Sequence, residues 1–180
     1  MTEFSGPAEM ETAAMRAYHN GRFDEAIQLF ASAEVSLRSA GDKKKAAEMA
    51  NNRSVALLQV HRPREALEAV EATPAVFEKH GDRLLTGQAY GNIAAAHEEL
   101  GHLEQARDAY RTCADVLGSL GASEQQAVAL QGLSRVQLRL GQPLPAVAAM
   151  EAGLDAHPSK GIRQRFLRRL LQIPRRLMGR

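Results

Sequence analysis

The sequence contains few of the residues that build disulfides, large aromatic cores or membrane spans. Its 180 residues include one cysteine and no tryptophan, and only 4% are aromatic. A single cysteine excludes a disulfide framework and any cysteine-rich metal site. No stretch approaches the roughly 20 consecutive apolar residues that a transmembrane helix needs, and Glu3 and Glu9 stand where a secretory signal would have its apolar core. We therefore expect a cytoplasmic protein.

Motifs for catalysis and for cofactor binding are also missing from the sequence. It has no Gly-rich phosphate loop and no Gly-x-Ser-x-Gly nucleophile turn. None of the six histidines lies four residues from another, so the spacing of a helical metal site is absent. Cys113 lacks the surroundings of a catalytic thiol and is expected to be a small buried residue. We expect a protein without enzymatic activity, metal or cofactor.

The net charge of +2 conceals an uneven distribution. From Lys160 to Arg180 the sequence has eight basic residues and no acid. Residues 1–159 hold 15 basic and 21 acidic residues, a balance of −6. The sequence therefore divides into an acidic body and a basic C-terminal segment.

Alanine and glycine show the clearest pattern among the residues that are present. The 31 alanines favour helix. Glycines recur every 40 residues in two series that are offset by 20, with His61 in place of one glycine: Gly21, Gly101 and Gly141, and Gly41, Gly81, Gly121 and Gly161. Because a glycine in the left-handed conformation commonly ends a helix, this interval predicts one helix in each 20 residues, separated by short turns.

Apolar residues between these glycines follow the spacing of an amphipathic helix. Small residues occupy one position in alternate helices, which lets two helices approach closely: Ala14, Ser54, Ala94 and Ser134. The pattern predicts helical hairpins that stack to bury their apolar stripes. 

Some local features of these helices can also be predicted. Asp42, Asp82 and Ser123 follow turn glycines and are expected N-caps. Pro74 is expected to kink or split its helix. Arg53 falls at a packing position, so its side chain is expected to extend to solvent, to a ligand or to an acid such as Glu48.

The turns between paired helices resemble those of tetratricopeptide repeats. The first and third turns, Gly21-Arg-Phe-Asp-Glu-Ala26 and Gly101-His-Leu-Glu-Gln-Ala106, are close matches to the family's pattern, whereas the second lacks the glycine and the fourth lacks the acid. The 40-residue period is similar to the long-helix branch of the family, which includes kinesin light chains, Pins-type adaptors and bacterial peptide-sensing regulators. The resemblance implies an all-α, right-handed superhelical solenoid of four hairpins with a C-terminal capping helix.

This resemblance also sets the expected domain organisation. Residues 1–7 would form a flexible N-terminus. The four repeats would span residues 8–40, 42–80, 82–120 and 122–157. Residues 159–180 would form a basic amphipathic cap or tail.

The family further implies a non-enzymatic adaptor whose first helices line a concave groove for a protein or peptide partner. Asn52 and Asn92 fall one repeat apart at a groove position where relatives hold a peptide backbone with asparagine amides, and Asn51 adds a neighbouring amide. The other expected groove residues are Met15, His19, Val55, Gln59, Gln88, Glu99, Gln131, Arg135 and Arg139. We expect the last two, four residues apart, to grip a carboxylate of the ligand. The alternative that these are ordinary solvated residues stays open.

The basic C-terminal segment supports two alternatives. Its apolar residues follow helical spacing, so it is expected either to cap the solenoid or to bind an anionic membrane surface. In the second case the contacts would come from Arg163, Arg165, Arg168, Arg169, Arg175 and Arg176. The absence of a recognition motif argues against nucleic acid as a partner. Self-association through an end or the convex surface is a further alternative, because four repeats make a short groove.

Overall fold

The structure is a computed structural model that describes residues 6–156, and all regular structure in this range is helical. Its helices are α1 (Pro7–His19), α2 (Phe23–Ser39), α3 (Lys43–Gln59), α4 (Pro63–Val70), α5 (Thr73–Lys79), α6 (Arg83–Glu99), α7 (Leu103–Ser119), α8 (Ser123–Arg139) and α9 (Pro143–Ala156). The starts of α3, α6 and α8 are 40 residues apart, and so are those of α2, α4, α7 and α9. The 40-residue period predicted from the glycines is confirmed.

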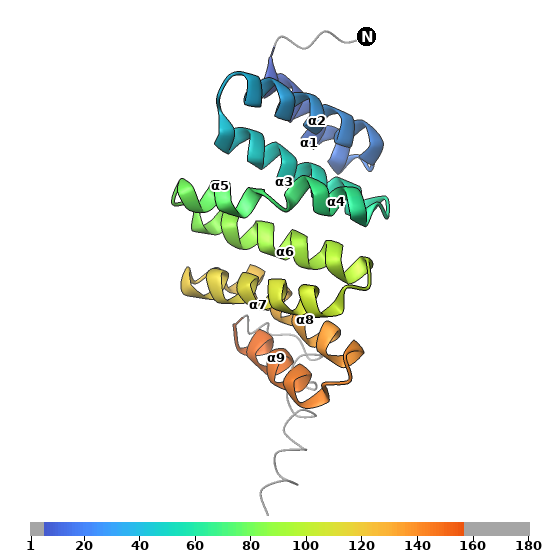
Figure 1. The fold of residues 1–180 in the computed structure, drawn as a ribbon, viewed down its shortest axis with the longest axis vertical. Helices are drawn as coiled ribbons and strands as arrows, with labels where there is room; N and C mark the ends of the chain where they lie inside the picture. The colour runs from blue at the N-terminus through green and yellow to red at the C-terminus, as the bar shows by residue number, and fades with distance from the viewer. Residues whose placement is uncertain (1–5, 157–180) are drawn as a thin grey trace, which may run out of the picture.

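Four helical hairpins stack along the long axis of the molecule (Figure 1). The first helices of the hairpins are α1, α3, α6 and α8, and the second helices are α2, α4 with α5, α7 and α9. Each helix packs against its neighbours in the chain, including the helix of the next hairpin. The chain is therefore an all-α superhelical solenoid, as the repeats predicted.

The turns follow from their glycines. Six turn glycines have positive φ angles between 70° and 82°, which lets the chain leave one helix and enter the next without a clash at Cβ. His61 takes the same place with a φ of 54°. Asp42 and Asp82 cap their helices as predicted, by accepting bonds from the backbone N–H groups of Lys45 and Leu85. The prediction for Ser123 is wrong, because Ala122 holds the N-cap position of α8.

The second helix of the second hairpin is split, as Pro74 predicted. α4 ends at Val70, and α5 begins at Thr73 with Pro74 in its first turn. The missing N–H of a proline is harmless in a first turn but would break the hydrogen bonding of a helix interior. Thr73 Oγ1 donates to the carbonyl of Val70 at 2.9 Å, which satisfies one carbonyl at the end of α4.

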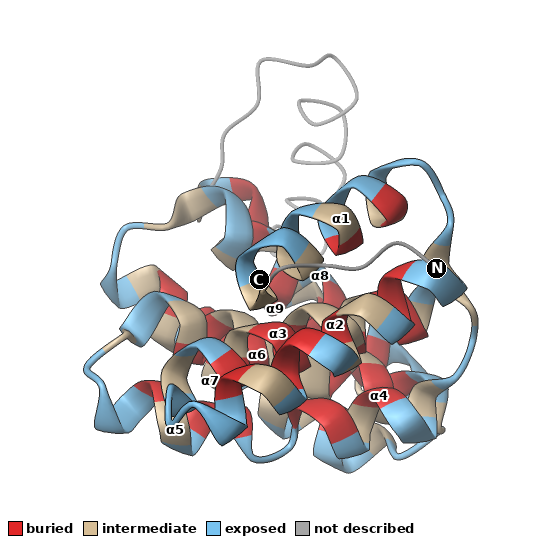
Figure 2. Cartoon of the chain, turned by 90° about the horizontal axis from the view of Figure 1, so that it is seen from above, coloured by how far each residue is buried: buried red, intermediate tan, exposed pale blue. Residues whose placement is uncertain are grey.

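The core lies between the helix layers and contains many alanines (Figure 2). Ala26, Ala66 and Ala106, at equivalent positions of three repeats, are completely buried. Phe30 and Phe77 are the largest fully buried side chains. Small residues at fixed positions thus allow the close helix approach expected from the sequence.

Several predictions concern residues outside the described range. These are most of the expected flexible N-terminus, and the basic segment 159–180 with its capping and membrane-binding alternatives and its arginines. In residues 6–156, no helix combines the length and the hydropathy needed to cross a membrane.

Candidate functional site

A cavity of about 490 Å³ lies between the first helices α6 and α8, and the second helix α7 forms its floor. One wall is formed by Gln88, Gly91, Asn92 and Ala95 of α6, and the other by Glu124, Gln125, Val128 and Ala129 of α8. The floor consists of Tyr110, Cys113 and Leu117 of α7. Two predicted groove residues, Gln88 and Asn92, therefore line a real cavity.

The asparagine side chains of neighbouring first helices contact one another. Asn92 Nδ2 donates to Asn51 Oδ1 at 2.9 Å, which links α6 to α3. This bond fixes which end of the Asn92 amide points toward α3. Among residues 6–156, the Oδ1 of Asn92 and the amide of Asn52 make no side-chain hydrogen bond, so both can bind a ligand.

The structure corrects the expectation for Asn51. Its side chain was expected to face the ligand, but the residue is only 5% exposed and is used to orient Asn92. Asn51 and Asn52 are consecutive in α3, so their side chains project about 100° apart. Asn52 is half-buried and Asn51 is inside.

Glycines in α6 and α8 allow the floor of the cavity to approach closely. A Cβ at Gly91 would lie 3.2 Å from Cys113 Sγ, and a Cβ at Gly132 would lie 2.5 Å from two ring carbons of Tyr110. Burial raises the pKa of the Cys113 thiol to about 11, so the side chain is a neutral, inert part of the floor at neutral pH. The floor is thus apolar and tightly packed.

Tyr110, in the floor of the cavity, also belongs to a buried carboxylate network. Arg135 of α8 makes a bidentate ion pair with Glu98 of α6, with Nε–Oε1 at 2.6 Å and Nη2–Oε2 at 2.7 Å. The Tyr110 hydroxyl donates to Glu98 Oε2 at 3.0 Å. Arg139 adds a bond from Nη1 to the backbone carbonyl of Glu98 at 3.3 Å and lies 3.5 Å from its carboxylate. Three helices therefore meet at a single acid.

The protonation states of this network follow from its contacts. Burial alone would raise the pKa of Glu98, but the hydrogen bonds from Arg135 and Tyr110, with the charges of both arginines, lower it below its ordinary value. The hydrogen bond to Glu98 raises the pKa of Arg135. Burial, followed by the charge of Glu98, raises the pKa of Tyr110. At neutral pH the acid is ionised, the arginine is charged and the phenol is neutral.

This network corrects the expectation for Arg135 and Arg139. They were expected to grip a carboxylate of a ligand, but the carboxylate that they pair with in the structure is Glu98 of the same chain. Their side chains are still about half exposed. The partner of Arg53 also differs from the acid suggested by the sequence, since Arg53 Nη2 lies 3.0 Å from Glu34 Oε2.

The remaining predicted groove residues do not line the cavity between α6 and α8. Val55 is half-buried on α3, and the others are exposed: Met15, His19, Gln59, Glu99 and Gln131. Among them, Glu99 has a recorded partner, the imidazole of His61 at 3.7 Å. The structure places these residues on the first helices without joining them to the cavity.

Sequence reasoning missed the contribution of α7 and the role of Glu98. Tyr110 and Leu117 follow the apolar spacing of an ordinary amphipathic helix, and nothing in that spacing indicates that they line a cavity. The sequence does contain a signal for the pairing of Glu98. Arg135 and Arg139 flank position 138, which lies one 40-residue repeat after Glu98. Opposite charges at matching heights on adjacent first helices are expected to pair.

In residues 6–156, no group of three or more His, Cys, Asp or Glu side chains is arranged to hold a metal ion.

Comparison with known proteins identifies the repeat. The family model described as tetratricopeptide repeat matches residues 87–116, which run from α6 into α7 and include Asn92 and Cys113. This match covers 30 of the 180 residues, so it identifies one tetratricopeptide repeat within the chain. A search of curated proteins found no match to this chain.

Solved structures share the fold at low sequence identity. BtubC (BKLC) from P. vanneervenii aligns with a TM-score of 0.76 and 14% identity, over 83% of this chain and 62% of that one. A putative kinesin light chain of Podosopora anserina, with nearly identical TPR-like repeats, aligns with a TM-score of 0.71 and 17% identity, over 84% and 76%. A Rap protein complexed with Competence and Sporulation Factor aligns with a TM-score of 0.72 and 15% identity, over 87% and 44%. This chain therefore spans less than two thirds of BtubC and less than half of the Rap chain.

Proposed function

We propose that this protein is a non-enzymatic interaction module that binds an extended peptide segment of a partner across its first helices. The observation that carries the proposal is the cavity between α6 and α8, which combines an apolar floor with an oriented amide, Asn92, in its wall. Pockets of this kind bind through apolar contact and use a few polar groups for orientation. The Rap structure in complex with Competence and Sporulation Factor supports a binding role for this fold.

Asn92 would hold the peptide backbone. Its Nδ2 already donates one hydrogen atom to Asn51, so the second hydrogen atom and Oδ1 can pair with a C=O and an N–H of the peptide. Asn52 sits 40 residues earlier at the same position of α3 and would repeat this contact one hairpin away. Backbone contacts of this kind hold a peptide without regard to its side chains.

An apolar side chain of the peptide would enter the cavity. The floor contributes the edges of Tyr110, Cys113 and Leu117, and the wall includes Val128, which is 63% exposed. Covering Val128 removes apolar surface from water and stabilises the complex. Glu124 lines the wall near the start of α8, and its charge would favour the peptide direction that brings a basic group to it.

Selection from a random peptide display library against the full chain tests the proposal. A selected peptide is then titrated against the wild type, the double variant Asn52→Ala/Asn92→Ala and the control Asn20→Ala, which removes an exposed amide at the end of α1. We expect the double variant to bind at least about tenfold more weakly, because each lost amide bond contributes about 1 kcal/mol. The control should bind as the wild type does.

Circular dichroism checks that the double variant is still folded. Both asparagines lie on helices, and alanine is the better helix former, so the helical signal should be retained. Unchanged affinity in a folded double variant would remove the peptide-binding role from these amides. Failure to select any peptide would count equally against the proposal.

A further inference from the structure

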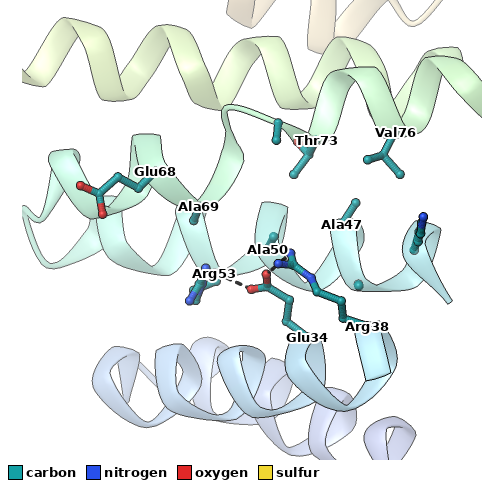
Figure 3. A pocket seen from close by; sticks show the side chains of 12 residues that line it. Glu34, Arg38, Ala47, Ala50, Arg53, Glu68, Ala69, Thr73 and Val76 are labelled. Carbon is teal, nitrogen blue, oxygen red and sulfur yellow. Dashed lines mark hydrogen bonds and ion pairs between the residues drawn. The ribbon is translucent and has the colours of Figure 1, made fainter. Parts of the chain in front are cut away.

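The second helices carry a separate hollow on the opposite side of α3. A cavity of about 490 Å³ lies between α2 and the split helices α4 and α5, with α3 as its floor (Figure 3). A second cavity of about 430 Å³ continues from it toward the end of α5, because both include Lys43 and Val76. We call the two together the outer trough. Ala50 in its floor projects about 160° away from Asn52 on α3, so the outer trough is distinct from the proposed peptide site.

The split of the second helix shapes the outer trough. α2 and α7 each run for 17 residues without interruption, whereas the corresponding segment here is divided between Val70 and Thr73. Small side chains then line the hollow: Ala46, Ala47 and Ala50 from α3, Ala69 from the end of α4 and Ala72 from the break. A narrow, smooth floor of this kind has room for a peptide strand but offers few polar groups of its own.

The charges around the outer trough are unusual for this molecule. Residues 6–156 contain 15 basic and 20 acidic residues, yet five lysines and arginines and only three acids line the two cavities. Lys43 and Lys79 make no ion pair with any residue of the described range. The outer trough is therefore a positive strip on a negative body, which attracts acidic groups.

The arginines at one end are arranged around a shared acid. Arg38 Nη2 lies 2.7 Å from Glu34 Oε1, and Arg53 Nη2 lies 3.0 Å from Glu34 Oε2 (Figure 3). Two positive charges thus meet a single, largely buried carboxylate. Arg53 Nε and Glu34 Oε2 are both buried without a hydrogen-bond partner among the described residues. Two guanidinium groups face one carboxylate, so this cluster has an excess positive charge that can attract a further anionic group.

From these observations we infer that the outer trough is a second binding site, which takes an extended acidic segment of a partner protein. One carboxylate binds at Arg38 and Arg53, another binds at Lys43 and Lys79, and small side chains between them lie on the alanines of α3. Ten residues of α3 separate Lys43 from Arg53, a distance of about 15 Å. An extended chain covers this distance in four to five residues.

Nuclear magnetic resonance on the ¹⁵N-labelled full chain tests this site. The probe is the peptide acetyl-Glu-Ser-Ala-Ser-Glu-amide at low ionic strength, and its neutral analogue with glutamine at both ends is the control. We expect saturable shifts of the amide signals of Ala47, Ala50 and Val76 with a dissociation constant of about 1 mM. The neutral analogue should leave these signals in place.

Two matched charge-reversal variants distinguish binding in the outer trough from general electrostatic attraction to the protein. Lys43→Glu reverses a charge that lines both cavities, and Lys45→Glu makes the same change two residues away on a side chain that lines neither. Both are exposed positions in the first turn of α3, where an acid is favourable, so both variants should fold. We expect Lys43→Glu to weaken binding about fivefold or more, and Lys45→Glu to change it less than about twofold.

Three results would overturn the inference. These are equal binding of the neutral analogue, equal weakening by the two lysine variants, and absence of saturable shifts in the outer trough. Asn52→Ala/Asn92→Ala should bind the acidic probe as the wild type does. The proposals for the outer trough and for the cavity between α6 and α8 can therefore be refuted independently.

Discussion

Replacement of Gly132 by alanine should destabilise the protein, although alanine is the better helix former. Gly132 lies in the middle of α8, where removing a glycine would ordinarily stabilise the helix by about 1 kcal/mol. The new Cβ would lie 2.5 Å from Cε1 and Cζ of Tyr110. That ring is 7% exposed, and Glu98 holds its hydroxyl, so it has little freedom to move aside.

The magnitude follows from two opposing contributions. Forcing a side chain into a packed core costs about 1–3 kcal/mol, and displacing the Tyr110 hydroxyl from the ionised Glu98 costs about 1.5–3 kcal/mol more. After the gain in helix propensity, the free energy of unfolding should fall by about 1.5–5 kcal/mol. Thermal unfolding followed by circular dichroism should show a midpoint about 3–20 °C lower.

Gly118→Ala provides the matched control. Its Cβ would contact the amide end of the Gln126 side chain, which can rotate away. The control should therefore be as stable as the wild type or slightly more stable. A Gly132→Ala protein with an unchanged midpoint would refute the packing argument, and so would an equal loss of stability in both variants.

Three further predictions concern single side chains of the described helices. Glu98→Gln should lower the urea midpoint at pH 7 and have a smaller effect near pH 4: the folded-state pKa of Glu98 is lowered, so its stabilisation is present above its ordinary pKa and is lost as the pH falls. An equal drop in the urea midpoint at pH 7 and near pH 4 would contradict this. His61→Gly should raise the free energy of unfolding by about 0.5–1 kcal/mol, because φ at this position is 54° and its ion pair is exposed; a lower midpoint would show that the side chain matters more. Cys113, with a pKa of about 11, should react with a thiol reagent at pH 8 much more slowly in the folded chain than in urea, and comparable rates would place it at the surface.

Helix positions could be predicted from the sequence because their signals are local. A turn glycine, a capping aspartate or Pro74 acts on the few residues around it, and each of these predictions agrees with the helix bounds. The prediction that Ser123 is the N-cap of α8 was wrong. Ala122 and Ser123 both lie next to the turn, and Ala122 holds the N-cap position.

Site residues were harder to predict because their environment depends on distant helices. The repeat register put Asn51, Asn52 and Asn92 at groove positions, but it could not separate Asn51 from Asn52, which differ by a rotation about α3; in the structure Asn92 lines the cavity and Asn51 is buried. Arg135 was predicted without its partner, because Glu98 lies 37 residues earlier in the chain. Ion pairs between first helices, such as Arg135 with Glu98, depend on how the two neighbouring helices pack.

The 40-residue recurrence of glycine and small residues was sufficient to specify four helical hairpins, since each hairpin repeats the same local turn and the same apolar stripe. The cavity between α6 and α8, the occupation of two arginines by Glu98, and the outer trough beside the split helix arise from contacts between helices of different repeats. Such contacts depend on the distance and rotation between packed helices. A periodic sequence constrains those two quantities only through the volumes of all the side chains that meet.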